Sequence, residues 1–401
     1  MKPYHLYCRA YQKVMYVAEF VLPWHFPKIT SGAGSVKKAA KILRQNQIDN
    51  VIVVTDKGLR GLGLLDPMLK SLDDAKIKYC VFDGVQPNPT IYNIEDAREM
   101  YLANGCKGII AFGGGSPMDC AKAMAARIVN PKKSVADMGG LLKVGKKIPT
   151  MIAIPTTAGT GSETTLAAVV SNPETHEKYP INDPHLLPAY AILDPELTTG
   201  LPKHITSTTG MDALTHAVEA YIGQSNTKDT AEKALEATKL IFRYLKKAYD
   251  HGDDLMAREK MLLASHYAGI AFTRAYVGYV HAIAHTLGGF YGIPHGLANS
   301  VILPYVLDYY GETAYHRLAD LADAADLQPE DTSDKGKALA FIAAIREMNT
   351  YMNIPDGFEQ IKEEDIPTLV QRALHEGNPL YPVPRIMDAA DCEAVIRKLM
   401  R

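Results

Sequence analysis

Residues 109–119 read IIAFGGGSPMD, and this stretch decides the class of the fold. The apolar run from Ile109 to Phe112 predicts a buried strand; three glycines, Ser116 and Pro117 follow it and lead into a helical pattern. Glycines let the backbone approach a ligand closely, and the free N–H groups at a helix start favour an anion. The stretch therefore predicts a strand, a phosphate-binding turn and a helix. A tight turn that needs glycine for steric reasons alone is the alternative.

Strand and helix signals alternate on both sides of this turn. Short apolar runs predict strands at residues 51–55, 79–82, 108–112, 151–155 and 189–193, and amphipathic patterns predict helices at 35–44, 94–103 and 117–127. Such alternation indicates parallel crossover units. We therefore expect residues 1–199 to form an α/β dinucleotide-binding domain with a Rossmann-like parallel sheet.

After about Leu201 the strand signals end and long helical patterns take over, at residues 231–249, 254–272 and 337–352. Gly200 and Pro202 punctuate the chain where the periodicity changes. We therefore expect an all-α domain over residues 200–401 that binds a metal and the substrate.

The amino-acid composition of the chain argues against several classes of function. The 401 residues suit two domains, and 43 Lys and Arg against 45 Asp and Glu give no field that would favour nucleic acid or an anionic membrane. No apolar run approaches the roughly 18 to 20 residues that span a bilayer, and the first residues lack the pattern of a secretion signal. The five cysteines are scattered, which argues against a disulfide framework. A cytoplasmic protein with a small-molecule partner is expected.

A second loop rich in hydroxyl groups follows the strand predicted at 151–155. Residues 155–163 read PTTAGTGSE, and the hydroxyls of Thr156, Thr157 and Thr160 suit phosphate oxygens and the carboxamide of nicotinamide. Both loops follow predicted parallel strands, and open α/β sheets bind ligands at the carboxyl ends of their strands. Although the chain lacks a GxGxxG fingerprint, and a polar surface loop is the alternative, dinucleotide binding is the better interpretation.

Acidic and histidine side chains recur at metal-ligand spacing in the second half. Asp212 and His216 are four residues apart, His281 and His285 repeat that spacing, and His295 follows a glycine-rich turn. Residues four apart share one face of a helix. Their apolar neighbours make such a polar set costly without a partner, and three imidazoles with one carboxylate suit Fe(II) or Zn(II). Any one of these histidines could be a hydrogen-bonded core residue, but the set predicts a metal site.

Residues 276–300 contain neither Lys nor Arg. A pocket beside the metal would then lack the cations that recognise phosphorylated or multiply anionic substrates. Neutral small alcohols and aldehydes are the expected substrates.

Four ordered motifs carry a resemblance to a known family: the glycine turn with Asp119, the loop at 155–163, GMDALTH at 210–216, and His281 to Gly296. Together they resemble the iron-containing, group III alcohol dehydrogenases, close to the propanediol and butanol dehydrogenase types. The similarity covers nearly the whole chain.

The resemblance implies a Rossmann-like N-terminal domain followed by an all-α C-terminal domain, which is the dehydroquinate synthase-like fold. Its metal, Fe(II) with Zn(II) as the alternative, is expected on Asp212, His216, His281 and His295. His285 is expected near the substrate, as a proton relay or as a group that orients a ligand. The cofactor contacts are expected on Asp56, Asn88, Gly114, Gly115, Ser116, Asp119, Thr156, Thr157, Thr160 and Lys178.

The implied activity is NAD(H)-dependent alcohol oxidation or aldehyde reduction, in which the metal polarises the alcohol or carbonyl oxygen and hydride is exchanged with nicotinamide. A carboxylate at Asp56 would repel the 2′-phosphate of NADP, so NAD is expected. The resemblance also implies a homodimer or a larger homo-oligomer. The alternatives are a lyase resembling dehydroquinate synthase, a metal-dependent hydrolase, and a metal-storing or structural protein.

Overall fold

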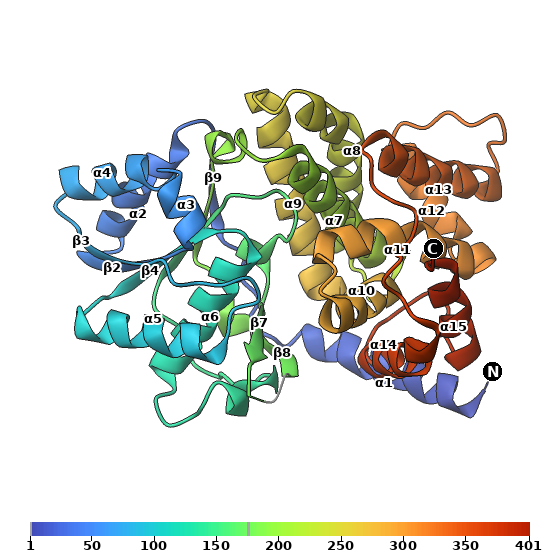
Figure 1. Ribbon diagram of the computed structural model, residues 1–401, viewed down its shortest axis with the longest axis horizontal. Helices are drawn as coiled ribbons and strands as arrows, with labels where there is room; N and C mark the ends of the chain where they lie inside the picture. The colour runs from blue at the N-terminus through green and yellow to red at the C-terminus, as the bar shows by residue number, and fades with distance from the viewer. Residues whose placement is uncertain (1, 175–176) are drawn as a thin grey trace. The chain divides into compact units, whose positions relative to one another are not determined.

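The computed structural model describes residues 2–174 and 177–401. The chain divides into two compact units (Figure 1): residues 23–200 form an α/β unit, and residues 1–22 and 201–401 form a helical unit. The sequence predicted an α/β domain over residues 1–199 and a helical domain from residue 200, whereas in the structure the residues before Pro23 belong to the helical unit. They join the helical unit because helix α1, Pro3–Glu19, hydrogen bonds to the backbone of residues 379–384.

A parallel sheet of six strands forms the centre of the α/β unit, in the order β1-β9-β6-β4-β2-β3. All five strand pairs are parallel, as the crossover pattern predicted. The strands are β1 (Lys28–Ser31), β2 (Asn50–Val54), β3 (Lys78–Phe82), β4 (Gly108–Gly113), β6 (Met151–Pro155) and β9 (Tyr190–Leu193). Apolar runs in the sequence predicted five of the six strands but not β1, a short edge strand whose four residues are exposed or partly exposed.

Both faces of this sheet are buried, which explains why its strands read as continuous apolar runs. Ile52 and Ile109 point to one face with helices α5 and α6, whereas Val53 and Ile110 point to the other with α2 and α4. Helices accordingly lie on the two sides of the sheet in Figure 1. Their bounds are α2 (Ala39–Gln45), α3 (Lys57–Gly61), α4 (Asp66–Asp74), α5 (Ile91–Ala103) and α6 (Gly115–Val129).

A small second sheet was not predicted. It has the order β5-β8-β7, with β5 (Gly140–Leu141), β7 (Ala167–Asn172) and β8 (Glu177–Asn182), and β7 pairs antiparallel with β8. Its strands are short or interrupted by Pro180, so their periodicity is weak. It carries Lys178, one of the predicted cofactor residues.

The helical unit is built around α7, whose residues from Gly210 to Ile222 are all buried. Helices α8, α9 and α11 pack against it. Besides α1, the helices are α7 (Lys203–Ile222), α8 (Lys228–Asp250), α9 (Leu255–Ala275), α10 (Tyr279–Tyr291), α11 (His295–Tyr310), α12 (Tyr315–Ala324), α13 (Asp334–Tyr351), α14 (Ile366–Gly377) and α15 (Ala389–Lys398). Within the described part of the chain, no helix combines the length and apolar composition needed to cross a bilayer.

Candidate metal and dinucleotide sites

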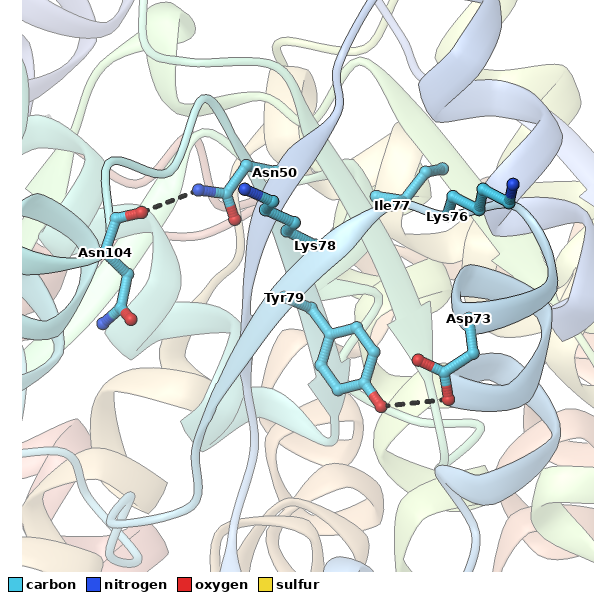
Figure 2. A pocket seen from close by; sticks show the side chains of 7 residues that line it. All are labelled: Asn50, Asp73, Lys76, Ile77, Lys78, Tyr79 and Asn104. Carbon is cyan, nitrogen blue, oxygen red and sulfur yellow. Dashed lines mark hydrogen bonds between the residues drawn. The ribbon is translucent and has the colours of Figure 1, made fainter.

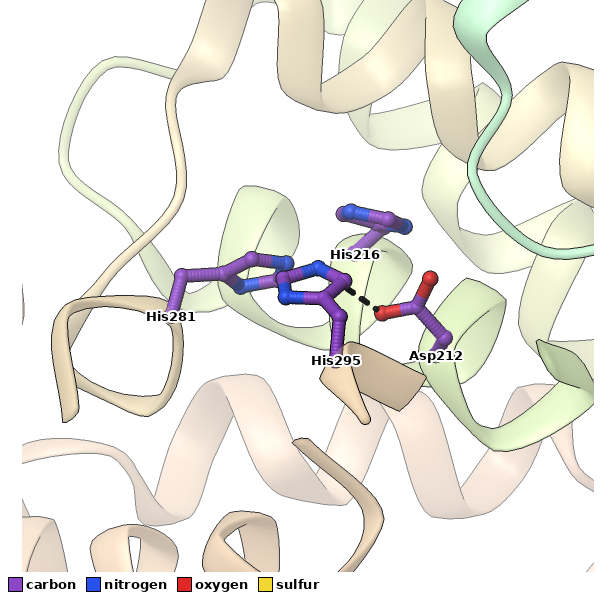
Figure 3. Close-up of side chains that lie close together, drawn as sticks. All are labelled: Asp212, His216, His281 and His295. Carbon is purple, nitrogen blue, oxygen red and sulfur yellow. Dashed lines mark ion pairs between the residues drawn. The ribbon is translucent and has the colours of Figure 1, made fainter. Parts of the chain in front are cut away.

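The four side chains of the predicted metal site lie close together in the helical unit (Figure 3). One ligand atom from each of Asp212, His216, His281 and His295 lies within 4.8 Å of the others. The first three side chains are buried and His295 is partly exposed. The four ligand atoms carry lone pairs and lie close together in a largely buried position. They repel one another unless a cation or a hydrogen-bond donor lies among them. The chemistry of this set therefore fits a divalent metal ion.

The backbone explains how these residues meet. Asp212 and His216 lie one turn apart on α7, so both side chains leave the same face of that helix. His281 lies in the first turn of α10, and His295 is the first residue of α11. Gly292, with φ of 69°, ends α10 in the left-handed conformation and lets the chain turn back toward α11.

Glu219, which no sequence pattern indicated, orients His281. Its carboxylate accepts hydrogen bonds from Nδ1 of His281 (2.6 Å) and from the backbone N–H groups of Gly278 and Val280. Burial raises the pKa of Glu219 to about 8, and burial lowers the pKa of His281 well below its ordinary value. A neutral His281 that donates through Nδ1 keeps the lone pair of Nε2 directed at the cluster, as metal ligation requires.

Asn299 was also missed, although it lies one turn after His295 on α11. It is fully buried, and its Nδ2 donates to Oδ1 of Asp212 at 2.7 Å. The same nitrogen lies 3.1 Å from Nε2 of His281 and 3.1 Å from Nε2 of His295. The amide of Asn299 therefore covers the side of the cluster formed by Asp212, His281 and His295. The spacing of four from His295 was the signal that could have identified it.

His285 lies beside the cluster. Its ring stacks on that of His295 with centroids 5.1 Å apart, and 39% of its side chain is exposed. Nδ1 of His285 pairs with Oε1 of Glu376 at 2.7 Å, and the hydroxyl of Tyr381 donates to the same oxygen at 2.8 Å. Burial opposes ionisation of Glu376, but the charge of His285 and these hydrogen bonds lower its pKa below the usual value. No sequence pattern indicated Glu376 or Tyr381, because Glu376 lies 91 residues after His285 and Tyr381 contacts it from the segment beyond α14.

The predicted cofactor residues of the α/β unit gather around the carboxyl ends of three neighbouring strands. Asp56 follows β2, the glycine turn follows β4, and the threonine loop follows β6. Thr156 donates its backbone N–H to the carbonyl of Gly113, so the two loops are in contact. Asp56 accepts the N–H of Leu59 and begins helix α3. Lys178 donates to Asn88 at 2.8 Å. Burial raises the pKa of Asp119 to about 6, and the charge of Lys178 acts against this rise.

Gly113, the first glycine of the turn, is required because a side chain there would clash with a neighbour. Gly113 has φ of +147°, and a Cβ there would lie 2.6 Å from Cγ of Pro117. Helix α6 begins at Gly115, two residues before the predicted start at Pro117, and Gly114 is its N-cap. Gly114, Gly115 and Ser116 are partly exposed at this helix start, where backbone N–H groups are available to an anion.

The carboxylate of Asp119, expected to contact the cofactor, is engaged by the protein itself. It accepts hydrogen bonds from the hydroxyl of Ser162 and the backbone N–H of Val169, both at 3.2 Å. Next to it, the fully buried ammonium of Lys122 donates to backbone and hydroxyl oxygens of Ser162 and Thr165 and to the carbonyl of Ala167. Burial lowers the pKa of Lys122 to about 8. These contacts fasten the threonine loop to α6.

A surface hollow of the α/β unit lies elsewhere (Figure 2). It is lined by Asn50, Asp73, Lys76, Ile77, Lys78, Tyr79 and Asn104. Asn50 and Lys78 are the first residues of β2 and β3, so the hollow lies at the amino ends of these strands. Parallel sheets bind ligands at the opposite edge, so the hollow is separate from the predicted dinucleotide residues.

Sequence models of known protein families match both the α/β part and the helical part of the chain. The sequence model of the iron-containing alcohol dehydrogenases matches residues 27–195, and that of the C-terminal part of the Fe-containing alcohol dehydrogenase family matches residues 206–400. The chain belongs to the iron-containing alcohol dehydrogenase family. It is therefore an enzyme, an oxidoreductase that acts on alcohols.

The relatives of this iron-containing alcohol dehydrogenase have similar lengths. A 1,3-propanediol dehydrogenase from Klebsiella pneumoniae is 39% identical over 351 residues, which cover 86% of this chain and 90% of the relative. An NAD-dependent methanol dehydrogenase from Bacillus methanolicus is 34% identical over 386 residues, covering 96% and 100%. A crystal structure of a 1,3-propanediol oxidoreductase superposes with a TM-score of 0.91 at 36% identity, covering 95% of this chain and all of the other.

Proposed function

We propose that this dehydrogenase is NAD(H)- and metal-dependent and interconverts small alcohols and aldehydes. The observation that carries the proposal is the convergence of Asp212, His216, His281 and His295 in a member of the iron-containing family. The donor set is chemically suited to Fe(II), with Zn(II) as the alternative. When bound, the metal supplies Lewis-acid stabilisation of negative charge on the substrate oxygen.

The proposed cofactor is NAD, which supplies the hydride chemistry. Support comes from Asp56 at the end of β2, because its carboxylate would repel the 2′-phosphate of NADP. The relative from Bacillus methanolicus is named as NAD-dependent. We propose that Gly114, Gly115, Ser116, Thr156, Thr157 and Thr160 bind the dinucleotide together with Asn88, Lys178 and Asp56. Asp119 would act through Ser162, by holding the threonine loop in place.

Small uncharged alcohols and aldehydes are the proposed substrates. Residues 276–300 carry no Lys or Arg, so the part of α10 and α11 that bears three of the histidines offers no cation to an anionic substrate. The buried amide of Asn299 covers one side of the cluster. The substrate oxygen must then approach from another side.

The decisive experiment is an anaerobic assay of the iron-loaded and zinc-loaded protein with NADH or NADPH and a panel of aldehydes. We expect aldehyde-dependent oxidation of NADH, more weakly with NADPH, and none after the metal is removed with a chelator. Full metal loading without NADH oxidation for any aldehyde would contradict the proposal. Turnover of a phosphate ester without nicotinamide would favour a hydrolase.

Asn299 gives a prediction about the metal site. Replacing Asn299 by Leu removes the donor to Asp212 while keeping side-chain volume, and should weaken metal affinity about tenfold, a typical effect of losing a partner of a metal ligand. Competition with a chromophoric chelator measures the effect. Ser300→Ala is the control, because its hydroxyl donates only within α11, to the carbonyl of Gly296. Equal affinities of the two variants would refute the proposed role of Asn299.

We propose that His285 relays a proton between the substrate and solvent, through its half-exposed ring and with Glu376 as its partner. His285→Ala should lower turnover about 100-fold, a typical contribution of a positioned acid or base, and change the pH profile while metal content stays the same. His375→Ala, an exposed neighbour on α14, should leave both unchanged. Unaltered kinetics in the first variant would end the relay proposal, whereas loss of metal would favour a role in orienting a ligand.

A further inference from the structure

Helix α1 precedes the residues that match the family, which begin at residue 27, yet it is anchored in the helical unit. Its buried residues are Cys8 at 0% exposure, Gln12 at 5% and Glu19 at 4%, so two of the three are polar. Its outer side carries exposed apolar residues such as Val14 and Val17. Helix α1 therefore lacks the continuous buried apolar stripe of a helix that is held by hydrophobic packing alone. Hydrogen bonds therefore contribute to holding α1 in place.

The first of these contacts is with the segment that follows α14. The guanidinium of Arg9 donates to the carbonyls of Val383 (2.7 Å) and Pro384 (2.8 Å). The amide of Gln12 donates to the carbonyls of Tyr381 (2.7 Å) and Pro379 (3.1 Å). This segment carries the hydroxyl that donates to Glu376, the partner of His285. Helix α1 thus fixes the backbone on which that hydroxyl depends.

The second contact is with Tyr276, the residue after α9. Tyr276 has φ of 64° and ψ of 177°. This backbone region is nearly restricted to glycine, and a side chain there costs about 1–3 kcal/mol unless the surroundings hold it. The hydroxyl of Tyr276 hydrogen bonds to the carboxyl group of Glu19, which is 4% exposed and whose pKa burial raises to about 7. Glu19 is thus one of the groups that hold the strained residue.

Tyr276 lies only five residues before His281, and the chain between them is tightly constrained. Glu219 accepts the backbone N–H groups of Gly278 (2.9 Å) and Val280 (2.7 Å) as well as Nδ1 of His281. A change of backbone conformation at Tyr276 would pull on this short segment and on its hydrogen bonds to Glu219. It would then turn Nε2 of His281 away from the other three ligand atoms.

We propose that α1 is a positioning element of the metal site: Glu19 holds Tyr276 in its strained conformation and so aims His281, while Arg9 and Gln12 hold the segment that bears Tyr381. The inference rests on the proposed metal site. It adds to that site a helix that the family-matched part of the chain does not include.

Co(II) is a suitable probe, because its visible absorption reports the geometry of the site as well as its occupancy. Glu19→Ala should raise the dissociation constant of Co(II) about tenfold and alter its absorption bands. Tyr276→Phe removes only the hydroxyl that contacts Glu19 and should give the same rise. Lys13→Ala, exposed on the outer side of the same helix, is the matched control and should behave as the wild type.

A double variant distinguishes a positioning role of Glu19 from general destabilisation of the protein. Glycine adopts positive φ without strain, so in a Tyr276→Gly background Glu19→Ala should cause no further loss of Co(II) affinity. The same tenfold loss in that background would overturn the proposal, as would wild-type affinity and spectra for both Glu19→Ala and Tyr276→Phe. A wild-type protein that binds no Co(II) would instead refute the proposed metal site itself.

Discussion

Replacement of His281 by Ala is expected to abolish metal binding at micromolar concentrations and to lower alcohol turnover about 1000-fold. Losing the Lewis acid removes several kcal/mol of stabilisation of the charged transition state, and each 1.36 kcal/mol corresponds to a factor of ten. The substitution also leaves the buried carboxylate of Glu219 without its imidazole partner. Metal content after dialysis and steady-state kinetics under anaerobic conditions measure the two effects.

The matched control for this experiment is His316→Ala. His316 lies in the same unit, is 79% exposed and pairs only with the exposed Asp334. It should retain metal and activity. If the His281 variant kept a full complement of metal and the turnover of the wild type, the four-residue site would be wrong, whatever the family of the chain.

Replacement of Lys122 by Met should have the largest effect in the α/β unit. The ammonium of Lys122 is fully buried and is the donor to carbonyls of Ser162, Thr165 and Ala167. Without it these carbonyls lose their charged donor, and the carboxylate of Asp119 loses a nearby cation, so we expect a loss of about 3 kcal/mol in the free energy of unfolding. Urea titration followed by circular dichroism measures this loss.

The same variant should bind the dinucleotide poorly, because the threonine loop is no longer fastened to α6. A displaced loop of this kind lowers kcat/KM by about 100-fold. Lys132→Met, at an exposed position of the same unit, should change neither stability nor kinetics. A Lys122 variant of normal stability with normal NADH affinity, measured by calorimetry, would show that the buried ammonium does not hold the loop.

Local patterns in the sequence were enough to predict the architecture. Apolar runs such as Ile109 to Phe112 are buried on both faces of the sheet, so they identify parallel strands without any knowledge of their neighbours. The spacing of Asp212 and His216 fixes their common helix face, because an α-helix repeats about every four residues. Both inferences depend only on contacts within one strand or one turn of helix.

The residues that orient the candidate ligands and hold the loops could not be predicted. Their contacts join segments that lie far apart in the sequence. Glu219 meets His281 across 62 residues, Lys122 meets Ser162 across 40, and Gln12 meets Tyr381 across 369. Side chains from distant segments become neighbours only when helices and strands pack, and a lone buried Lys or Glu in a sequence looks like any solvated charge. The sequence by itself therefore determined the two-part fold and the candidate ligands, and the tertiary structure decided which groups orient them and to which unit α1 belongs.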